Sequence, residues 1–469
     1  MAKYTREQLE TKSKDELIDI ILVMQSMIET LVARVTSLEQ EVERLKKPRN
    51  SRNSSLPPSQ DLFSYKNQSL RQKSNRKTGG QTGHKGHTLE MCDNPDFTEH
   101  HFPDNICPCC KKAHTTSDFT ILEHRQVIDI PVIKATVTDH LVYGAKCSCG
   151  YQDRGVFPSH INAPVQYGTN LTALVSYLSA RQFVPMNRLT ELIGSITNVS
   201  MSQGTVFNML NRVAKSLTPL YDGIKNDVKK ATTVGGDETG SKVNGKKNWA
   251  WVWQSPRETY IVNSKNRGFA TILENFPGGF PDSFYVSDSL SAQLKTTAKG
   301  HQLCIAHLLR ELNFFIEKYN STWAKKLKEL LESSINLKKR MSQQDYEQCD
   351  DRNRILKQFA LLISEDIPQN IKKLNALQKR LRKHRHSIFN YLFYPEVPFD
   401  NNGSERAIRN VKVKQKVSGG FRSDRGADIF SIIRSVVDTI IKKGEDPLTN
   451  ITFALKIAAH KKNFLLSRS

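Results

Sequence analysis

Three acidic residues, far apart in the chain, are candidates for metal-assisted chemistry. Asp237 stands in "VGGDETG", which we expect to end a strand, and Asp288 ends the apolar run "FYVSD". Glu405 falls in the first turns of a helix that we expect to open at "DNNGSE". Strand and helix ends can converge on one edge of a sheet. Because carboxylates suit Mg²⁺ and Mn²⁺, the three acids predict a site for two such ions acting on a phosphodiester.

Each of these acids has a competitor nearby in the sequence. Glu238 competes with Asp237, Asp282 with Asp288, and Asp400 with Glu405, although Asp400 fits better as a helix N-cap. The chain has 47 acidic residues, and an Asp after a strand is commonly only a turn former. Spacing alone therefore does not single out the triad.

A basic strip follows Glu405 on the same expected helix. Arg409 and Lys412 come four and seven residues later, so the three side chains share one face. This arrangement suits a helix lying along DNA, while simple pairing of Glu405 with Arg409 is the alternative. The candidate DNA-binding residues of this helix are Arg406, Arg409, Lys412, Lys414 and Lys416.

The composition favours a polyanionic partner. The 469 residues include 69 Lys and Arg against 47 Asp and Glu, a formal charge of +22. Ribosome binding or a basic tail would also explain this surplus. No run of 18 apolar residues and no secretory signal occurs. We therefore expect a cytoplasmic, nucleoid-associated protein that has DNA and not a membrane as its partner.

Five of the eight cysteines lie between residues 107 and 149, which favours a metal site over disulfides. Residues 119–142 alternate apolar and polar side chains and predict short strands between the two cysteine groups. The whole pattern is similar to a zinc ribbon. We expect a different role for Cys304-x-x-His307: a core cysteine and a histidine facing the active site, not a metal site.

The N-terminal region carries the clearest periodicity. Two seven-residue series run through residues 15–47 and predict a parallel coiled-coil dimer, with an amphipathic helix packed on its own domain as the alternative. The first series is Leu17, Met24, Leu31, Leu38 and Leu45, and the second is Ile21, Ile28, Val35 and Val42. Residues 48–91 predict a flexible basic arm that tracks DNA phosphates, or a plain linker. Its candidate DNA-binding residues are Lys73, Arg76, Lys77 and Lys85.

The rest of the chain alternates helical and strand-rich segments. Residues 165–230 predict helices, including a helix-turn-helix with Ser202 as N-cap of its second helix, or a generic helical pair. Residues 231–310 predict three antiparallel strands, a helix and further strands, which suggests a ribonuclease-H-like sheet. Residues 311–394 read as a charged helical insertion, and Gly444 ends a last helix from about residue 426.

In order along the chain, these segments resemble the DDE transposases of insertion-sequence family sixty-six. The resemblance rests on "NSSLPPSQD", "GGQTGHKGHTL", "CPCC" with "CSCG", "DETG", "SDSLSAQL", "CIAHLLREL", "DNNGSERAIRNVKV" and "GGFRSDRGADIFS". It implies that Asp237, Asp288 and Glu405 are the catalytic acids. It also implies strand cleavage at element ends, transfer of the freed 3′ hydroxyl to target DNA, and accessory transposition proteins as further partners.

The resemblance further implies a structural Zn²⁺ site, with one departure from the family pattern. The second cysteine pair is Cys147-x-Cys149 where the family often has CxxC. Together with Cys107 and Cys110 it can still form a tetrahedral site. Cys109 competes with Cys110 for this role. His100, His101 or His114 could replace one ligand.

The sequence thus predicts a multidomain α+β protein with a ribonuclease-H-like catalytic core. The expected parts are a coiled-coil helix (1–47), a basic flexible linker (48–91), a zinc-binding domain (92–160), a helix-turn-helix-like helical segment (161–230), the first part of the core (231–310), an all-helical insertion (311–396), and the last part of the core with C-terminal helices (397–469). A dimeric DNA-binding regulator without catalysis and a structure-specific nuclease are the alternative functions.

Overall fold

The computed structural model describes residues 5–46, 89–158 and 160–466. These residues form two compact units. The smaller comprises residues 89–139 and 192–200, and the larger contains the remaining described residues. Among the helices described, none has both the length and the apolar character needed to cross a membrane.

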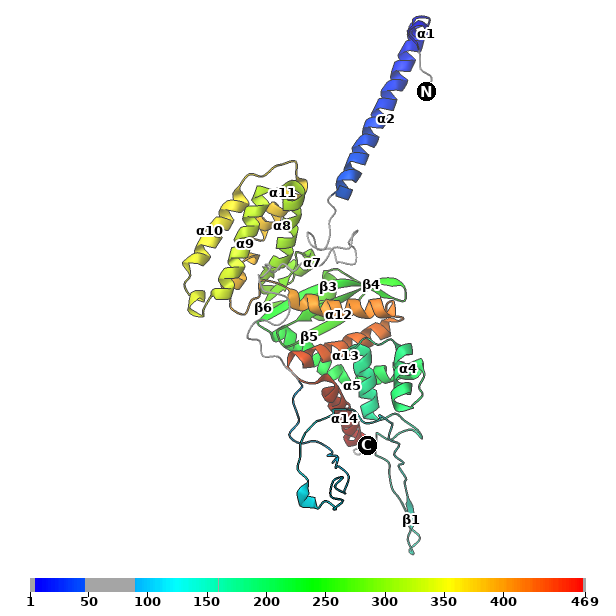
Figure 1. Cartoon of the computed structure of the whole chain (residues 1–469). Helices are drawn as coiled ribbons and strands as arrows, with labels where there is room; N and C mark the ends of the chain where they lie inside the picture. The colour runs from blue at the N-terminus through cyan, green and yellow to red at the C-terminus, as the bar shows by residue number, and fades with distance from the viewer. Residues whose placement is uncertain (1–4, 47–88, 159, 467–469) are drawn as a thin grey trace. The chain divides into compact units, whose positions relative to one another are not determined.

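The N-terminal segment is helical as predicted. A short helix α1 (Arg6–Glu10) precedes the long helix α2 (Lys14–Lys46), which is drawn in blue in Figure 1. The side chains of the two heptad series are solvent-exposed between Ile21, at 61%, and Val42, at 45%, while Leu17 is half-buried. None of the described residues thus covers the periodic apolar face of α2. The predicted flexible linker falls almost entirely outside the described residues.

The predicted strands of residues 119–142 are wrong. All of these residues are described, and none of them is in a strand. Their apolar side chains are exposed, for example Val127 at 91% and Val132 at 92%. An alternating pattern forms a strand only when a second strand satisfies its backbone N–H and C=O groups, and no such strand pairs with this segment. Nearby, η2 (Thr116–Asp118) is a single turn, and β1 (Gly144–Lys146) pairs with β2 (Gln152–Arg154).

A five-stranded mixed sheet forms the centre of the larger unit. Its strands are β3 (Thr233–Val243), β4 (Lys246–Gln254), β5 (Thr259–Ser264), β6 (Phe280–Ser287) and β7 (Ala298–Leu303). Their order is β5-β4-β3-β6-β7. Strands β3, β4 and β5 are antiparallel, whereas β6 runs parallel to β3 and β7 parallel to β6. Asn244 and Gly245 join β3 to β4, and both have the positive φ that a two-residue hairpin turn requires.

Helices cover both faces of this sheet. On one face, Val252 and Ile261 pack against α12 (Asn402–Ser418) and α13 (Asp424–Lys442), which run along the sheet in Figure 1. On the other face, Trp251 and Trp253 stack at 5.5 Å between ring centroids and are fully buried. The side chain of Phe276, directly after α6 (Phe269–Asn275), lies edge-on to Trp253. Both tryptophans therefore belong to the core of the larger unit.

Further helices pack around α13. They are α3 (Thr169–Ala180), α5 (Gln203–Lys230) and α14 (Pro447–Leu466). Ser202 is the N-cap of α5, as predicted, and its Oγ accepts the N–H of Thr205 at 3.1 Å. Helix α4 (Met186–Thr197) precedes α5. Because α5 contacts α13 and β5, it belongs to the packing of the core as well as to the predicted helix-turn-helix.

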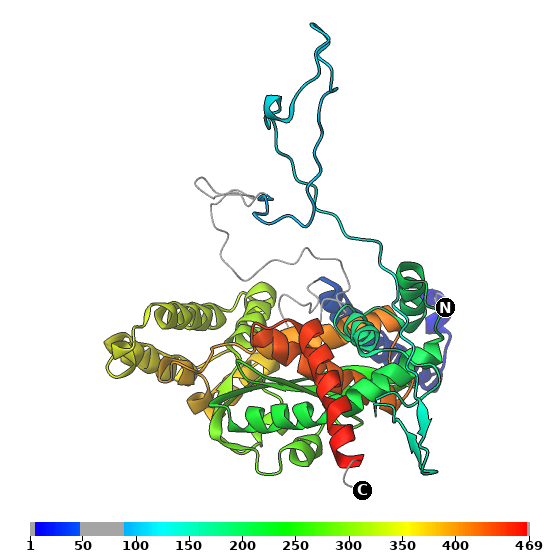
Figure 2. The same cartoon turned by 90° about the horizontal axis from the view of Figure 1, so that it is seen from below.

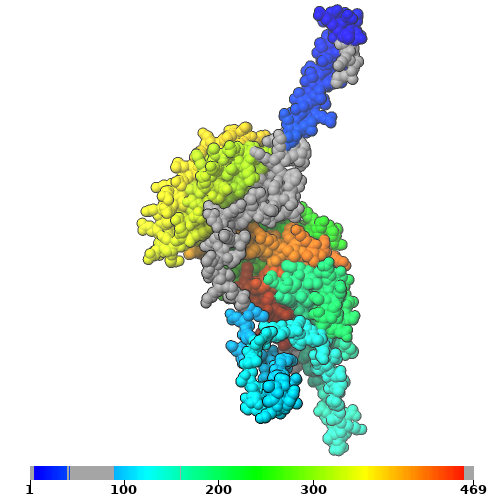
Figure 3. All heavy atoms as spheres, viewed as in Figure 1, coloured from blue at the N-terminus to red at the C-terminus, as the bar shows by residue number. Residues whose placement is uncertain are grey.

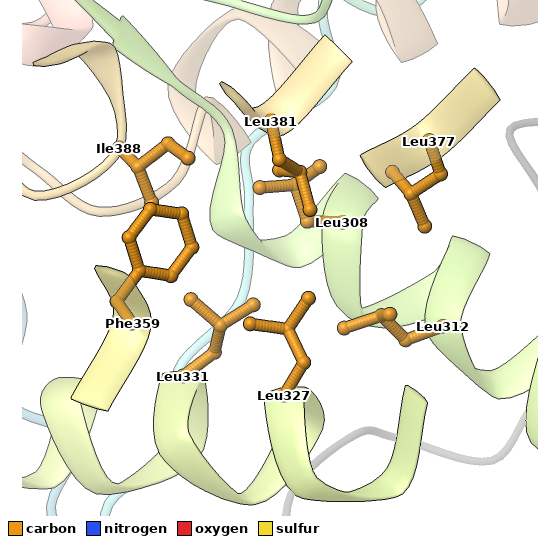
Figure 4. A pocket seen from close by; sticks show the side chains of 8 residues that line it. All are labelled: Leu308, Leu312, Leu327, Leu331, Phe359, Leu377, Leu381 and Ile388. Atoms are coloured by element: carbon orange, nitrogen blue, oxygen red, sulfur yellow. The ribbon is translucent and has the colours of Figure 1, made fainter. Parts of the chain in front are cut away.

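The segment between the last strand and α12 is helical, as predicted, and lies to one side of the sheet (Figures 1 and 2). Leucines from several helices point toward one another there and form a dry apolar core around Phe359 and Ile388 (Figure 4). The helices of this segment are α8 (Ile305–Tyr319), α9 (Thr322–Arg340), α10 (Asp350–Ser364) and α11 (Lys372–Lys383), with single turns η3 (Gln344–Tyr346), η4 (Arg385–Ser387) and η5 (Asn390–Leu392). The short helix α7 (Ser291–Leu294) comes earlier, between β6 and β7.

Candidate active site

Two neighbouring parallel strands place Asp237 beside Asp288. The last residues paired between β3 and β6 are Gly235 and Val286, and each aspartate lies two residues further along its own strand direction. Asp288 directly follows β6, as expected. Asp237 was expected at the end of a strand, but it lies inside β3, because β3 continues past β6 to form the hairpin with β4.

The start of α12 brings Glu405 to the same region. Asn401, the N-cap of α12, donates from Nδ2 to the carbonyl of Gly236 at 2.7 Å, and its Oδ1 accepts the hydroxyl of Ser404 at 2.7 Å. Gly235 has no room for a side chain, because a Cβ there would lie 2.7 Å from the Ser404 hydroxyl. Gly235 therefore allows α12 to approach β3 closely, and Glu405 stands in the first turn of that helix.

The three predicted acids act on one another electrostatically. Burial raises the pKa of Asp237 well above its usual value, and the negative charges of Asp288, Glu238 and Glu405 raise it further. The N–H of Glu238 donates to Asp237 Oδ1 at 2.9 Å and opposes this rise in pKa only in part. Such a group of carboxylates favours the binding of cations, because a cation removes the repulsion that otherwise forces protons onto the acids.

The competing acids have different surroundings. Glu238 lies on the opposite face of β3 from Asp237, accepts two hydrogen bonds from Arg267 at 2.9 and 3.0 Å, and accepts one from Gln293 at 2.8 Å. Burial, followed by the charge of Asp288, raises the pKa of Glu238 to about 7 despite the arginine. Asp282 is exposed near the start of β6.

The expectation that Asp400 is the helix N-cap is wrong, because Asn401 holds that position. Asp400 Oδ1 instead accepts the N–H of Asn402 at 3.1 Å. Asn401 is the better cap here because its amide group also reaches the carbonyl of Gly236, a contact that a carboxylate cannot donate.

Three cationic or ionisable side chains surround Glu405. Arg310 of α8 lies 3.2 Å from Oε1, Arg409 of α12 lies 3.4 Å from Oε2, and His307 Nε2 lies 3.8 Å from Oε1. The predicted pairing of Glu405 with Arg409 is confirmed. Arg310 was missed by the sequence analysis, although it stands three residues after His307 and thus on the same helical face.

Cys304 and His307 form a possible metal-binding group with Glu405. One ligand atom from each of the three residues lies within 4.8 Å of the others. Burial raises the pKa of the Cys304 thiol to about 12 and lowers the pKa of His307. No metal site was expected here, because the sequence favoured a core cysteine with a histidine facing the active site. The third donor, Glu405, comes from a residue about a hundred positions away.

The basic side chains of α12 divide into two groups. Arg406, Arg409 and Lys416 are exposed, and part of α12 lies on the face seen in Figure 3, in orange. Lys412 instead donates to the carbonyl of Gly240 at 2.7 Å, and Lys414 is half-buried with its pKa lowered to about 8 by burial. Lys73, Arg76, Lys77 and Lys85 lie outside the described residues.

Each predicted cysteine pair closes a tight turn within its own unit. In the smaller unit, the N–H of Lys111 donates to the carbonyl of Cys107 at 3.0 Å. The backbone N–H groups of Cys110 and Cys109 form hydrogen bonds to the Cys107 sulfur and lower the pKa of its thiol. In the larger unit, the N–H of Gly150 donates to the carbonyl of Cys147, and Cys149 lowers the pKa of the Cys147 thiol in the same way. Thiols held by backbone N–H groups are suited to binding metals as thiolates.

Comparison with known proteins identifies the family. Residues 5–90 match a family of unknown function, DUF6444. An uncharacterized protein of Sinorhizobium fredii, y4jD, is 21% identical over 378 residues, which cover 73% of this chain and 72% of that protein. Residues 164–429, more than half of the chain, match the family described as "Transposase IS66 family", and this match contains the sheet, the insertion and all three acids. The chain therefore belongs to the IS66 family of transposases.

Proposed function

We propose that this transposase cleaves DNA at the ends of its element and joins the freed 3′ hydroxyls to target DNA, with Asp237, Asp288 and Glu405 as its catalytic acids. Two observations support the proposal: the charges of Asp288 and Glu405 raise the pKa of the buried Asp237, and Asn401 holds the start of α12 against β3. The strand order β5-β4-β3-β6-β7, with three antiparallel strands followed by two parallel ones, supports a ribonuclease-H-like core.

The donor set fits two Mg²⁺ or Mn²⁺ ions. Carboxylate oxygens are the ligands that these cations prefer, and the mutual repulsion that raises the pKa of Asp237 is relieved when a cation binds. When bound, a pair of such ions activates the attacking oxygen and stabilises the leaving one. The residues that would hold them are Asp237, Asp288 and Glu405.

The protein's own side chains orient the site and attract DNA. Asn401 fixes the N-terminus of α12 on β3, and Arg310 with Arg409 holds the Glu405 carboxylate from both sides. The exposed Arg406 and Lys416 extend the positive surface of α12 and can bind phosphates. The half-buried Lys412 and Lys414 act more as supports of this surface than as direct DNA contacts.

The remaining parts of the chain supply binding and assembly. Helices α4 and α5 provide the helix-turn-helix that contacts the element ends, and the basic stretch with Lys73, Arg76, Lys77 and Lys85 adds non-specific contacts to phosphates. Cys107, Cys110, Cys147 and Cys149 hold a structural Zn²⁺. The apolar face of α2 forms a parallel coiled-coil dimer. Accessory transposition proteins and a nucleoid location complete the proposal.

Incubation of the purified protein with labelled element-end DNA and Mg²⁺ tests the catalytic proposal. We expect both nicked and joined products from the wild type, and neither from Asp237→Asn, Asp288→Asn or Glu405→Gln. Asp282→Asn is the matched control, because Asp282 is an exposed acid of the same strand that Asp288 follows. DNA binding should persist in all four variants.

The pattern of products separates the alternatives. Nicks without joined products would favour a structure-specific nuclease. DNA binding without either product would favour a regulator without catalysis. Full activity in any of the three acid variants would remove that residue from the catalytic set.

A further inference from the structure

Beside the proposed magnesium site, the structure contains a second group of metal-binding atoms. Cys304 is the N-cap of α8, His307 stands one turn further along that helix, and Glu405 comes from the first turn of α12. Their ligand atoms all lie within 4.8 Å of one another. Cys304 is 1% exposed, and the side chains of His307 and Glu405 are 19% and 14% exposed. The group is therefore preorganised and largely shielded from solvent.

The chemistry of these donors selects a different cation from Mg²⁺. A thiolate, an imidazole and a carboxylate together suit Zn²⁺ or Co²⁺, which take such mixed donors in tetrahedral sites with water as fourth ligand. Mg²⁺ prefers oxygen ligands alone. The thiol proton leaves to solvent when such a cation binds.

Two further observations point to a ligand at this position. The Cys304 sulfur accepts the backbone N–H of Asn401 at 3.3 Å, a contact that stabilises negative charge on sulfur. The Nδ1 atom of His307 is buried and has no hydrogen-bond partner among the described residues. Burial of an imidazole nitrogen without a hydrogen bond costs free energy, unless a bound ligand takes the place of the missing partner.

Glu405 has to serve both sites. Arg310 binds one of its oxygens and Arg409 the other, so each cation must compete with an arginine for this carboxylate. A cation bound to Cys304, His307 and Glu405 therefore withholds Glu405 from the Mg²⁺ ions held by Asp237 and Asp288.

We propose that Cys304, His307 and Glu405 form an inhibitory site for a thiophilic divalent cation, with Zn²⁺ as the physiological candidate. Occupation of this site blocks Mg²⁺-dependent strand cleavage by removing one catalytic acid. The inhibitory consequence rests on the proposed function, whereas the existence of the metal site does not.

Titration of the metal-free, full-length protein with Co²⁺ tests the site itself. We expect a thiolate-to-cobalt charge-transfer absorption in the wild type. In Cys304→Ser this absorption should lose the contribution of one cobalt site. In Cys349→Ser it should be unchanged, because Cys349 is a half-buried cysteine of the insertion outside the proposed site. The cysteines between residues 107 and 149 contribute equally in both variants, so the difference reports Cys304 alone. Glu405→Gln and His307→Gln should weaken this Co²⁺ affinity about tenfold or more.

Identical cobalt spectra in the wild type and Cys304→Ser would overturn the proposal. Serine can accept the Asn401 N–H as cysteine does, and circular dichroism checks that this variant is folded. If Cys304→Ser does not fold, the Glu405→Gln and His307→Gln titrations decide, and unchanged Co²⁺ affinity in both would overturn the proposal.

Zinc inhibition tests the consequence. Each protein is assayed for Mg²⁺-dependent cleavage at increasing Zn²⁺, relative to its own activity without Zn²⁺. The concentration that halves activity should rise about tenfold or more in Cys304→Ser and stay the same in Cys349→Ser. Equal inhibition of the wild type and Cys304→Ser would refute the inhibitory role. If the wild type shows no cleavage at all, the proposed function fails while the cobalt titration still decides the metal site.

Discussion

Asp237 in β3 and Asp288 directly after β6 each stand two residues beyond the last paired residues of these parallel strands, and the charge of Asp288 raises the pKa of Asp237. The register of the two strands therefore sets the positions of both aspartates. Asn401 and Gly235 then allow the start of α12, which carries Glu405, to approach β3. The site therefore depends on a few contacts that can be changed one at a time.

Divalent cations should stabilise the folded protein through this cluster. A ligand that binds only the folded state at about a hundred times its dissociation constant adds about 2.7 kcal/mol to the free energy of unfolding. We expect Mg²⁺ to raise the midpoint of thermal unfolding of the wild type by several degrees. The same addition should have little effect on Asp237→Asn, whereas Asp282→Asn should respond as the wild type does. An equal response of Asp237→Asn would argue against the metal site.

Without divalent cations, stability should fall as the pH rises. The pKa of Glu238 is about 7 in the folded protein, against an ordinary value of 4.5, so the folded state holds a proton that the unfolded chain releases. The free energy of unfolding should therefore decrease between about pH 4.5 and 7, by about 3 kcal/mol for this group. Urea unfolding in EDTA, followed by tryptophan fluorescence, measures this loss. In Glu238→Gln the free energy of unfolding should decrease less steeply with pH. An unchanged pH dependence would show that Glu238 is not the group responsible.

Gly236 should not tolerate a side chain. A Cβ at this position would lie 2.0 Å from the hydroxyl of Tyr285, which is fully buried on the adjacent strand and cannot move aside. We expect Gly236→Ala to lower the free energy of unfolding by about 3 kcal/mol. Gly240→Ala is the control on the same strand, because its Cβ would meet nothing closer than Trp249 at 3.9 Å. Equal stability of the two variants in urea would show that β3 and β6 adjust more freely than the contacts imply.

Asn401 should act as a positioning residue for Glu405. Its replacement by alanine leaves the buried carbonyl of Gly236 without its donor, at a cost of about 1–3 kcal/mol, and releases Ser404. We expect the cleavage rate at saturating Mg²⁺ to fall about a hundredfold. Asn402→Ala removes only a bond to Asp400 and should retain most of the activity. If Asn401 had only a structural role, Asn401→Ala would lower Tm, but the folded fraction of the protein would cleave DNA at the wild-type rate.

The sequence predicted elements better than it predicted their contacts. Hydrophobic periodicity and turn residues located β3 to β6, the N-cap Ser202 and the helical insertion, because these features depend on residues close in sequence. The position of Asp237 inside β3 was missed, since the length of that strand is set by its hairpin partner β4. The strands expected at residues 119–142 failed for the same reason, because an alternating pattern carries no information about a partner strand.

The same limit applies to the candidate active site, whose contacts between distant residues could not be predicted from local patterns. The three acids were found through ordered motifs, but Arg310 and the grouping of Cys304 with Glu405 depend on the docking of α12 against α8. No local pattern encodes that docking. It depends on contacts between residues far apart in the sequence, such as the bond from the Asn401 N–H to the Cys304 sulfur at 3.3 Å.

The apolar face of α2 should hold two chains together. Its heptad side chains, such as Leu31 at 57% exposed, are not covered by any other part of the chain that the structure describes, and burial of each against a second copy would contribute about 1.5–3 kcal/mol. Leu31→Glu places a charge in the predicted seam and should halve the mass measured by light scattering at micromolar concentration. Ala33→Glu introduces the same charge two residues away, at an outward heptad position, and should leave the mass unchanged. A monomeric wild type, or a dimer of unchanged mass in Leu31→Glu, would contradict the coiled coil and leave the exposed face of α2 for another partner.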